Sequence, residues 1–172
     1  MKLNQRLQAF NEKRSALLDE LGALDPAMLV AKPLAGKWSM LEIVEHLVVA
    51  EKAVFQGMPD PSQLRERPRR LKDRVSYAIV VCVLRYGIPV QVPSPAMIPK
   101  GNRSLGELRR LWDDNQEWLR AYIDGLDQKD ISSAVFRHPI AGPLSVEQAL
   151  HMDQVHLDTH LRQIRRLQRL LM

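Results

Sequence analysis

Two histidines near the carboxyl end of the chain have the spacing of a metal-binding pair. His156 and His160 are four residues apart, which places their side chains on one face of a helix, about 40° apart around its axis. The surrounding apolar residues recur every three or four positions, so Asp153 and His160 fall on the inward stripe with His156 beside it. Buried polar groups cost free energy unless they are paired. The sequence therefore predicts that a metal ion or a hydrogen-bond network meets these imidazoles.

The predicted third ligand is His46, in the middle of a helix that begins at Ser39. It occupies the same flank of that helix's apolar stripe as His156 does on the last helix, so the three imidazoles converge if the two helices are neighbours. Three neutral imidazoles leave a coordination position open, which is typical of a catalytic metal site. Zinc or nickel is the expected metal, with iron as an alternative, although histidine ligation alone also admits copper. The competing interpretation is three core histidines bonded to carboxylates or carbonyls.

Other polar residues are candidates for the surroundings of this site. Glu42 and Asp153 each lie about one helical turn before a predicted ligand and are placed to accept a hydrogen bond from its second ring nitrogen. The alternative for each is a plain cap or a solvated charge, and Glu42 already belongs to a capping box. Asn115 either lines the cleft or is a buried amide bonded to backbone. His138 and His151 are interpreted as outer or surface residues.

Length and composition favour one helical domain covering residues 1–172. Cys82, the only cysteine, lies in an apolar run and is expected to act as a small core hydrophobe rather than a reactive thiol. No segment resembles a signal peptide, and none is long and apolar enough to span a bilayer. We therefore expect a cytoplasmic protein without a membrane partner.

The net charge of +5 invites a nucleic-acid interpretation, but the excess is concentrated in two places. These clusters are Arg65, Arg67, Arg69, Arg70, Lys72 and Arg74, and Arg162, Arg165, Arg166 and Arg169. The second cluster suits the solvated end of a helix. The first lacks interleaved aromatic residues and any nucleic-acid motif. The sequence thus predicts no specific nucleic-acid partner.

Three capping boxes mark helix starts, because each has a serine followed three residues later by an acid or amide. They begin at Ser39, Ser104 and Ser145. Apolar periodicity adds a first helix that ends before Asp25. Residues 71–86 are too apolar for periodicity to distinguish a helix from a buried strand, but their length and the lack of a second strand candidate favour a helix. The Pro-rich segment 87–101 is expected to be an irregular connection that wraps the surface or a cleft. All elements of consequence are predicted to be helical, giving an all-α bundle of four main helices and one accessory helix.

Four segments together resemble the DinB-like superfamily of bacterial metal proteins. They are Gly36-Lys-Trp-Ser-Met-Leu-Glu-Ile-Val-Glu-His-Leu47, Val92-Pro-Ser-Pro-Ala-Met-Ile-Pro99, His138-Pro-Ile-Ala-Gly-Pro-Leu-Ser145 and His156-Leu-Asp-Thr-His-Leu-Arg-Gln-Ile164. The resemblance implies an up-down-down-up four-helix bundle, often a homodimer, with a divalent metal held by His46, His156 and His160. Relatives commonly carry adjacent histidines near the last pair, whereas Thr159 precedes His160 here.

The resemblance also implies a function, a metal-dependent transfer of a low-molecular-weight thiol to an electrophile. A metal that binds the thiol as thiolate makes a protein nucleophile unnecessary, and the chain has no nucleophile elbow or phosphate loop. The alternative is a metal-dependent stress-response or ligand-binding module without turnover. A homodimer is expected on two grounds: the resemblance, and the apolar surface of the helix at Ser39 together with residues 78–84.

Overall fold

The structure is a computed structural model that describes residues 3–88, 92, 94–134, 136–138 and 140–172. Its described part is mostly helical, which confirms the all-α class. The α-helices are α1 (Leu3–Gly22), α2 (Pro26–Val30), α3 (Met40–Gln56), α4 (Leu71–Tyr86), α5 (Leu105–Asp124), α6 (Gln128–Ser132) and α7 (Val146–Leu171). Two 3-10 turns, η1 (Pro61–Gln63) and η2 (Pro95–Met97), lie in the connections on either side of α4.

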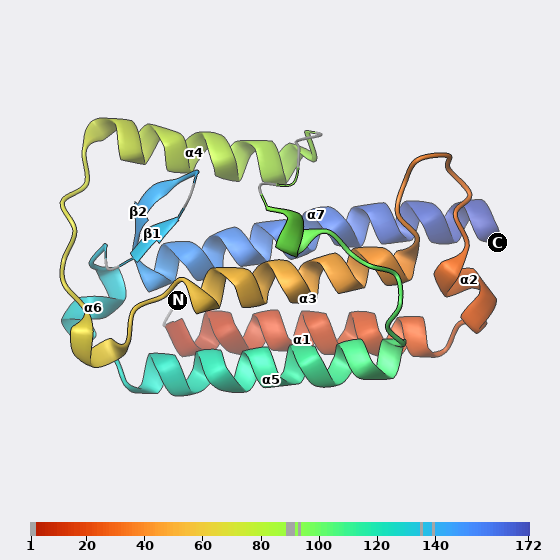
Figure 1. Ribbon diagram of the computed structural model, residues 1–172, viewed down its shortest axis with the longest axis horizontal. Helices are drawn as coiled ribbons and strands as arrows, with labels where there is room; N and C mark the ends of the chain where they lie inside the picture. The colour runs from red at the N-terminus through yellow and green to blue at the C-terminus, as the bar shows by residue number, and fades with distance from the viewer. Residues whose placement is uncertain (1–2, 89–91, 93, 135, 139) are drawn as a thin grey trace.

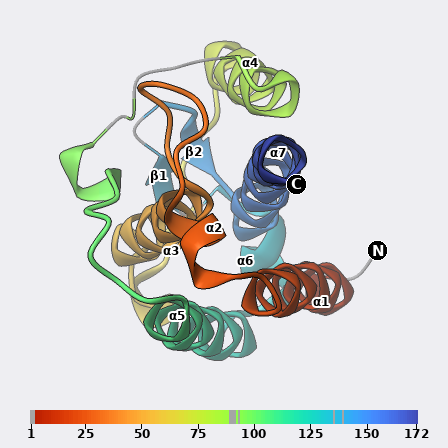
Figure 2. The same cartoon turned by 90° about the vertical axis from the view of Figure 1, so that its right-hand side faces the viewer.

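Four long helices, α1, α3, α5 and α7, lie side by side and form the body of the molecule (Figure 1). The colours show that α1 and α7 run in one direction and that α3 and α5 run in the other. Seen end-on, the four surround a common interior (Figure 2). That interior is filled by buried apolar side chains, including Phe10, Leu18, Val44, Trp112 and Ile164.

The three predicted capping boxes are all present. The Ser39, Ser104 and Ser145 hydroxyls each accept a hydrogen bond from a backbone N–H one turn into α3, α5 and α7. The acid or amide three residues later accepts from the backbone N–H of the serine in return. Because these bonds satisfy amides that the helix leaves free, they fix where the long helices start.

The helix α4 lies outside the four-helix body, alongside α7 (Figures 1 and 2). It packs through the partly buried Tyr77, Val80 and Val81, and none of its residues is fully buried. Near its end, the Thr159 hydroxyl of α7 donates to the Leu84 carbonyl. Cys82 is exposed, so the prediction of a core cysteine was wrong. The apolar run around it belongs to a helix with one face against the bundle and one face open.

A short hairpin departs from the prediction that all elements of consequence are helical. Strand β1 (Phe136–His138) pairs antiparallel with β2 (Gly142–Leu144), with Phe136 opposite Leu144. Both of these side chains are buried against the bundle, which anchors the loop that leads into α7. The short helices α2 and α6 were not predicted either. The predicted Pro-rich connection 87–101 lies partly outside the described residues.

Candidate metal centre

Three imidazoles meet between α3 and α7. The Nε2 atom of His156 lies 3.3 Å from Nε2 of His46 and 3.0 Å from Nε2 of His160. One ring nitrogen from each histidine can be chosen so that all three atoms lie within 4.8 Å of one another. The structure thus brings together the three histidines that the sequence singled out.

The opposite ring nitrogens of two of these histidines bind acceptors. Nδ1 of His46 lies 2.7 Å from the Met97 carbonyl oxygen, and Nδ1 of His160 lies 2.8 Å from Gln163 Oε1. A carbonyl oxygen can only accept, so the proton sits on Nδ1 in both rings and their Nε2 atoms carry lone pairs. If His156 Nε2 carries a proton, it can donate a hydrogen bond to Nε2 of His46 or of His160 but not to both. The cluster therefore has an electron-rich centre suited to a cation.

The spacing also agrees with coordination chemistry. Zinc–imidazole bonds are about 2.0–2.1 Å long, which puts the nitrogens of a tetrahedral site about 3.3 Å apart. Two of the three separations, 3.0 and 3.3 Å, are close to that value, and the three nitrogens all lie within 4.8 Å of one another. The donor set therefore fits one divalent ion with at least one position left for another ligand.

Burial keeps the three rings neutral. Desolvation lowers the pKa of His46, and desolvation together with the two neighbouring imidazoles holds the pKa of His156 well below its ordinary value. Desolvation also lowers the pKa of His160 to about 4. Neutral imidazole is the form that binds metal, so the rings have the required protonation state at neutral pH.

A buried glutamate secures the connection that holds His46. Glu45 is 1% exposed, and its carboxylate accepts from the backbone N–H of Gly101 at 2.7 Å and from Arg103 Nη1 at 2.8 Å. Gly101 has φ +69, and a Cβ there would lie 3.3 Å from Glu42 Oε1, so any other residue at this position would be strained. This anchor fixes the chain just after η2. The last residue of η2 is Met97, whose carbonyl oxygen contacts His46 Nδ1.

Glu42 does not orient His46; of the roles that the sequence left open for it, the structure shows the helix cap. Its carboxylate accepts from the Ser39 backbone N–H at 2.8 Å and from Lys32 Nζ at 2.8 Å. The cap therefore takes one carboxylate oxygen and Lys32 takes the other. The Met97 carbonyl, from a distant part of the chain, holds His46 instead.

Asp153, for which the sequence left open a role as partner of His156 or as a solvated charge, is hydrogen-bonded to Glu51 of α3. Asn115 is a buried amide whose Nδ2 donates to the Val48 carbonyl at 3.0 Å, which settles the two alternatives for it. Asp153 of α7 and Asn115 of α5 are thus hydrogen-bonded to α3 and not to the histidines.

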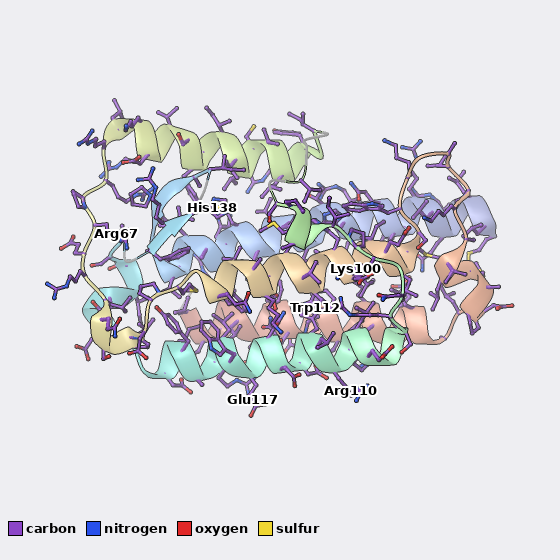
Figure 3. All side chains as sticks on the ribbon, viewed as in Figure 1. Arg67, Lys100, Arg110, Trp112, Glu117 and His138 are labelled. Carbon is purple, nitrogen blue, oxygen red and sulfur yellow. The ribbon has the colours of Figure 1, made fainter. Side chains whose placement is uncertain are left out.

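The two remaining histidines do not join the cluster. His151 pairs through Nδ1 with the Tyr77 hydroxyl at 2.7 Å. His138 lies on the hairpin (Figure 3), where its Nδ1 accepts from the backbone N–H of Ala141 at 3.0 Å. Their interpretation as outer residues agrees with these contacts.

Three residues of the site had not been predicted. Gln163 lies three residues after His160, and helical spacing gives a signal for that contact. Glu51 sits inside the apolar pattern of α3, where a buried acid needs partners. Met97 contributes a backbone carbonyl, which no side-chain pattern can reveal.

A surface hollow of about 490 Å³ lies elsewhere, lined by α1 and α5 residues that include Arg14, Asp113 and Glu117. It contains none of the three histidines. The ring of Trp38, with its centroid 4.8 Å from that of His46, covers one side of the cluster instead.

Comparisons with known proteins identify the family of the chain. The family profile described as the DinB superfamily matches residues 9–164. An uncharacterized protein of Bacillus subtilis (strain 168), YuaE, is 26% identical over 166 residues, which cover 92% of this chain and 94% of that protein. No solved structure matches the chain. No helix among the described residues is long and apolar enough to cross a membrane.

Proposed function

The chain belongs to the DinB superfamily, and we propose from that premise that His46, His156 and His160 bind one divalent metal ion at which a small molecule is activated. The observation that carries the proposal is the convergence of the three imidazoles, with their Nε2 atoms 3.0 and 3.3 Å from their neighbours. An all-imidazole donor set favours zinc or nickel, with iron as an alternative.

The residues of the chain prepare this centre in three ways. The Met97 carbonyl and Gln163 hold the His46 and His160 rings with their Nε2 atoms inward. Burial keeps the rings unprotonated. Trp38 shields His46 from solvent on one side. A divalent ion bound here would supply a Lewis acid that lowers the pKa of a coordinated thiol or water.

We propose that the activated molecule is a low-molecular-weight thiol and that the reaction is its transfer to an electrophile. Cys82, the chain's single cysteine, is exposed on α4, so the protein does not supply a thiolate from the bundle interior. A thiol nucleophile would then come from a small molecule. We place the protein in the cytoplasm, where such thiols are kept reduced.

The test is a thiol-transfer assay with bacillithiol, mycothiol and glutathione against a panel of electrophiles. Zinc- or nickel-loaded protein should consume one thiol per electrophile, and His46→Ala should lose this turnover while remaining helical. A metal-loaded protein that turns over none of these pairs would contradict the transferase assignment. Such a result would favour the ligand-binding alternative.

A further inference from the structure

A second polar cluster lies in the bundle interior, one helical turn from the metal centre. Glu51 is 4% exposed, and each of its oxygens accepts a hydrogen bond from α5: Oε2 from Trp112 Nε1 at 3.1 Å and Oε1 from Gln116 Nε2 at 2.8 Å. Asp153 of α7 is hydrogen-bonded to the same carboxylate. The two acids form the Glu51–Asp153 pair.

Hydrogen-bond counting assigns a proton to this pair. A carboxylate only accepts, so a hydrogen bond between two carboxyl groups requires one of them to be protonated. Glu51 already accepts from two donors, which makes Asp153 the proton-bearing partner. Consistent with this, burial raises the pKa of both carboxyls, and the neighbouring Glu51 charge raises that of Asp153 further. The Asp153 Oδ2 atom is buried and has no hydrogen-bond partner among the described residues.

The pair is close to the predicted metal ligands. Asp153 precedes His156 by three residues on α7, and side chains at this spacing are neighbours on a helix, with Cβ atoms about 5–6 Å apart. An opposite charge at such a distance favours the ionised form of a carboxyl group. Three neutral imidazoles contribute no negative charge to offset a divalent ion in this buried place.

We propose that the Glu51–Asp153 pair is the counter-charge of the metal centre and that it releases its shared proton when the centre takes up a divalent ion. The inference rests on the proposed metal binding. In the exchange, the O–H bond of Asp153 breaks, the proton passes to solvent and the pair gains one negative charge. The donors Trp112, Asn115 and Gln116 remain to hold the ionised pair.

The groups around the Glu51–Asp153 pair are neutral or already paired, so the pair is the group expected to change its charge when the metal binds. From α3 and α7 the titratable neighbours are the three histidines, which burial keeps neutral. From α5 the contacts are the neutral Trp112, Asn115 and Gln116. On α1, the Arg14 guanidinium lies 5.7 Å from the centre of the Trp112 ring, which itself donates to Glu51. Arg14 is already paired with Asp113 at 2.6 Å.

The experiment measures zinc binding to the metal-free full chain by calorimetry, in buffers of different ionisation enthalpy. The titrations are made between about pH 7 and pH 8.5, which is above the ordinary pKa of histidine. The wild type should release close to one proton per zinc ion more than Asp153→Asn, which can still hydrogen-bond Glu51 but has no proton to lose. For each unit of pH increase, the zinc affinity of the wild type should gain about tenfold relative to that of Asp153→Asn.

Two controls separate this coupling from general effects. Asp158→Asn removes an exposed carboxylate of the same helix, paired with Lys13 at 2.6 Å, and should leave the proton count unchanged. Glu51→Gln removes the other member of the pair and should also reduce the release. Circular dichroism checks that each variant is folded, and infrared spectroscopy of the metal-free protein should show a protonated-carboxyl band that Asp153→Asn loses.

The possible failures are distinguishable. If zinc binds to wild type and Asp153→Asn with the same proton release, the counter-charge inference is wrong and the metal site stands. If no zinc binds to the wild type, the proposed function itself fails, and the counter-charge role falls with it.

Discussion

The Gln163 side chain holds the outer ring nitrogen of His160. Gln163 accepts from His160 Nδ1 at 2.8 Å, and partners of this kind typically affect metal affinity by 10–100-fold. We expect Gln163→Ala to weaken zinc binding about tenfold. Gln163→Glu, which keeps an acceptor at the same place, should retain most of the affinity. Competition with a chromogenic chelator measures both variants, and equal affinities of Gln163→Ala and wild type would contradict this role.

The depressed pKa of His160 makes the metal-free fold sensitive to acid. Burial lowers this pKa from 6.5 to about 4, so between these values the unfolded chain binds a proton that the folded chain excludes. Stability is therefore unaffected by this group above pH 6.5 and falls as the pH drops through the window, by about 3 kcal/mol in total. His160→Gln should reduce the loss. Urea unfolding of the chelator-treated protein at several pH values measures it, and parallel pH profiles would count against it.

The sequence located the three histidines of the site but not the groups that hold them. Helical spacing was enough for His156 and His160, because four residues make about one turn. The position of His46 required α3 and α7 to be neighbours, which the structure provides. Met97 is 51 residues from His46 in the chain, and no local pattern encodes that contact. For Glu42 the sequence left a helix cap and a histidine partner open, and the hydrogen bond from the Ser39 N–H shows the cap.

Among the helices, α7 carries two of the three predicted ligands and begins with a capping box. The buried Ser145 hydroxyl accepts from the Gln148 N–H at 3.2 Å, and Gln148 Oε1 accepts from the Ser145 N–H at 3.1 Å. Ser145→Ala should lower the free energy of unfolding by about 1 kcal/mol. Ser76→Ala in the middle of α4 is the matched control. It should not lower the free energy of unfolding, because alanine favours helix interiors. Urea unfolding compares them, and equal stabilities would argue against the cap.

Helix boundaries were the most predictable part of the fold. The hydroxyl and acid of each box sit within one turn of each other, so the signal is local, and all three boxes are present. The hairpin was missed because strands of three residues are too short to show an alternating pattern. The helical state of residues 71–86 was predicted correctly. Its place outside the four-helix body depends on long-range packing, and this is why Cys82 was placed wrongly in a core.

At the scale of the whole molecule, α4 presents an open apolar face. Leu71, Ile79 and Tyr86 are 77%, 57% and 74% exposed, and Val75 and Cys82 continue the same stripe at spacings of three and four residues. In an antiparallel pair of α4 helices, Leu71 would face Tyr86 of a second copy and Val75 would face Cys82. We therefore expect a homodimer that buries this face.

Sedimentation of wild type and Ile79→Glu tests the dimer. The wild type should sediment as a dimer at micromolar concentration. Ile79→Glu should be monomeric, because it places a charge near the centre of the paired stripe. Exposed Val30 offers a control position off α4, and Val30→Glu should remain dimeric. A monomeric wild type, or a dimer indifferent to Ile79→Glu, would show that α4 is not the interface.

The central claim is that His46, His156 and His160 hold one divalent ion. Elemental analysis of purified wild type, His156→Ala and His160→Ala, each loaded with zinc and desalted, tests it most directly. We expect close to one zinc ion per wild-type chain and at least tenfold weaker binding in both variants, with unchanged helical circular dichroism. Equal metal content in all three proteins would contradict the account.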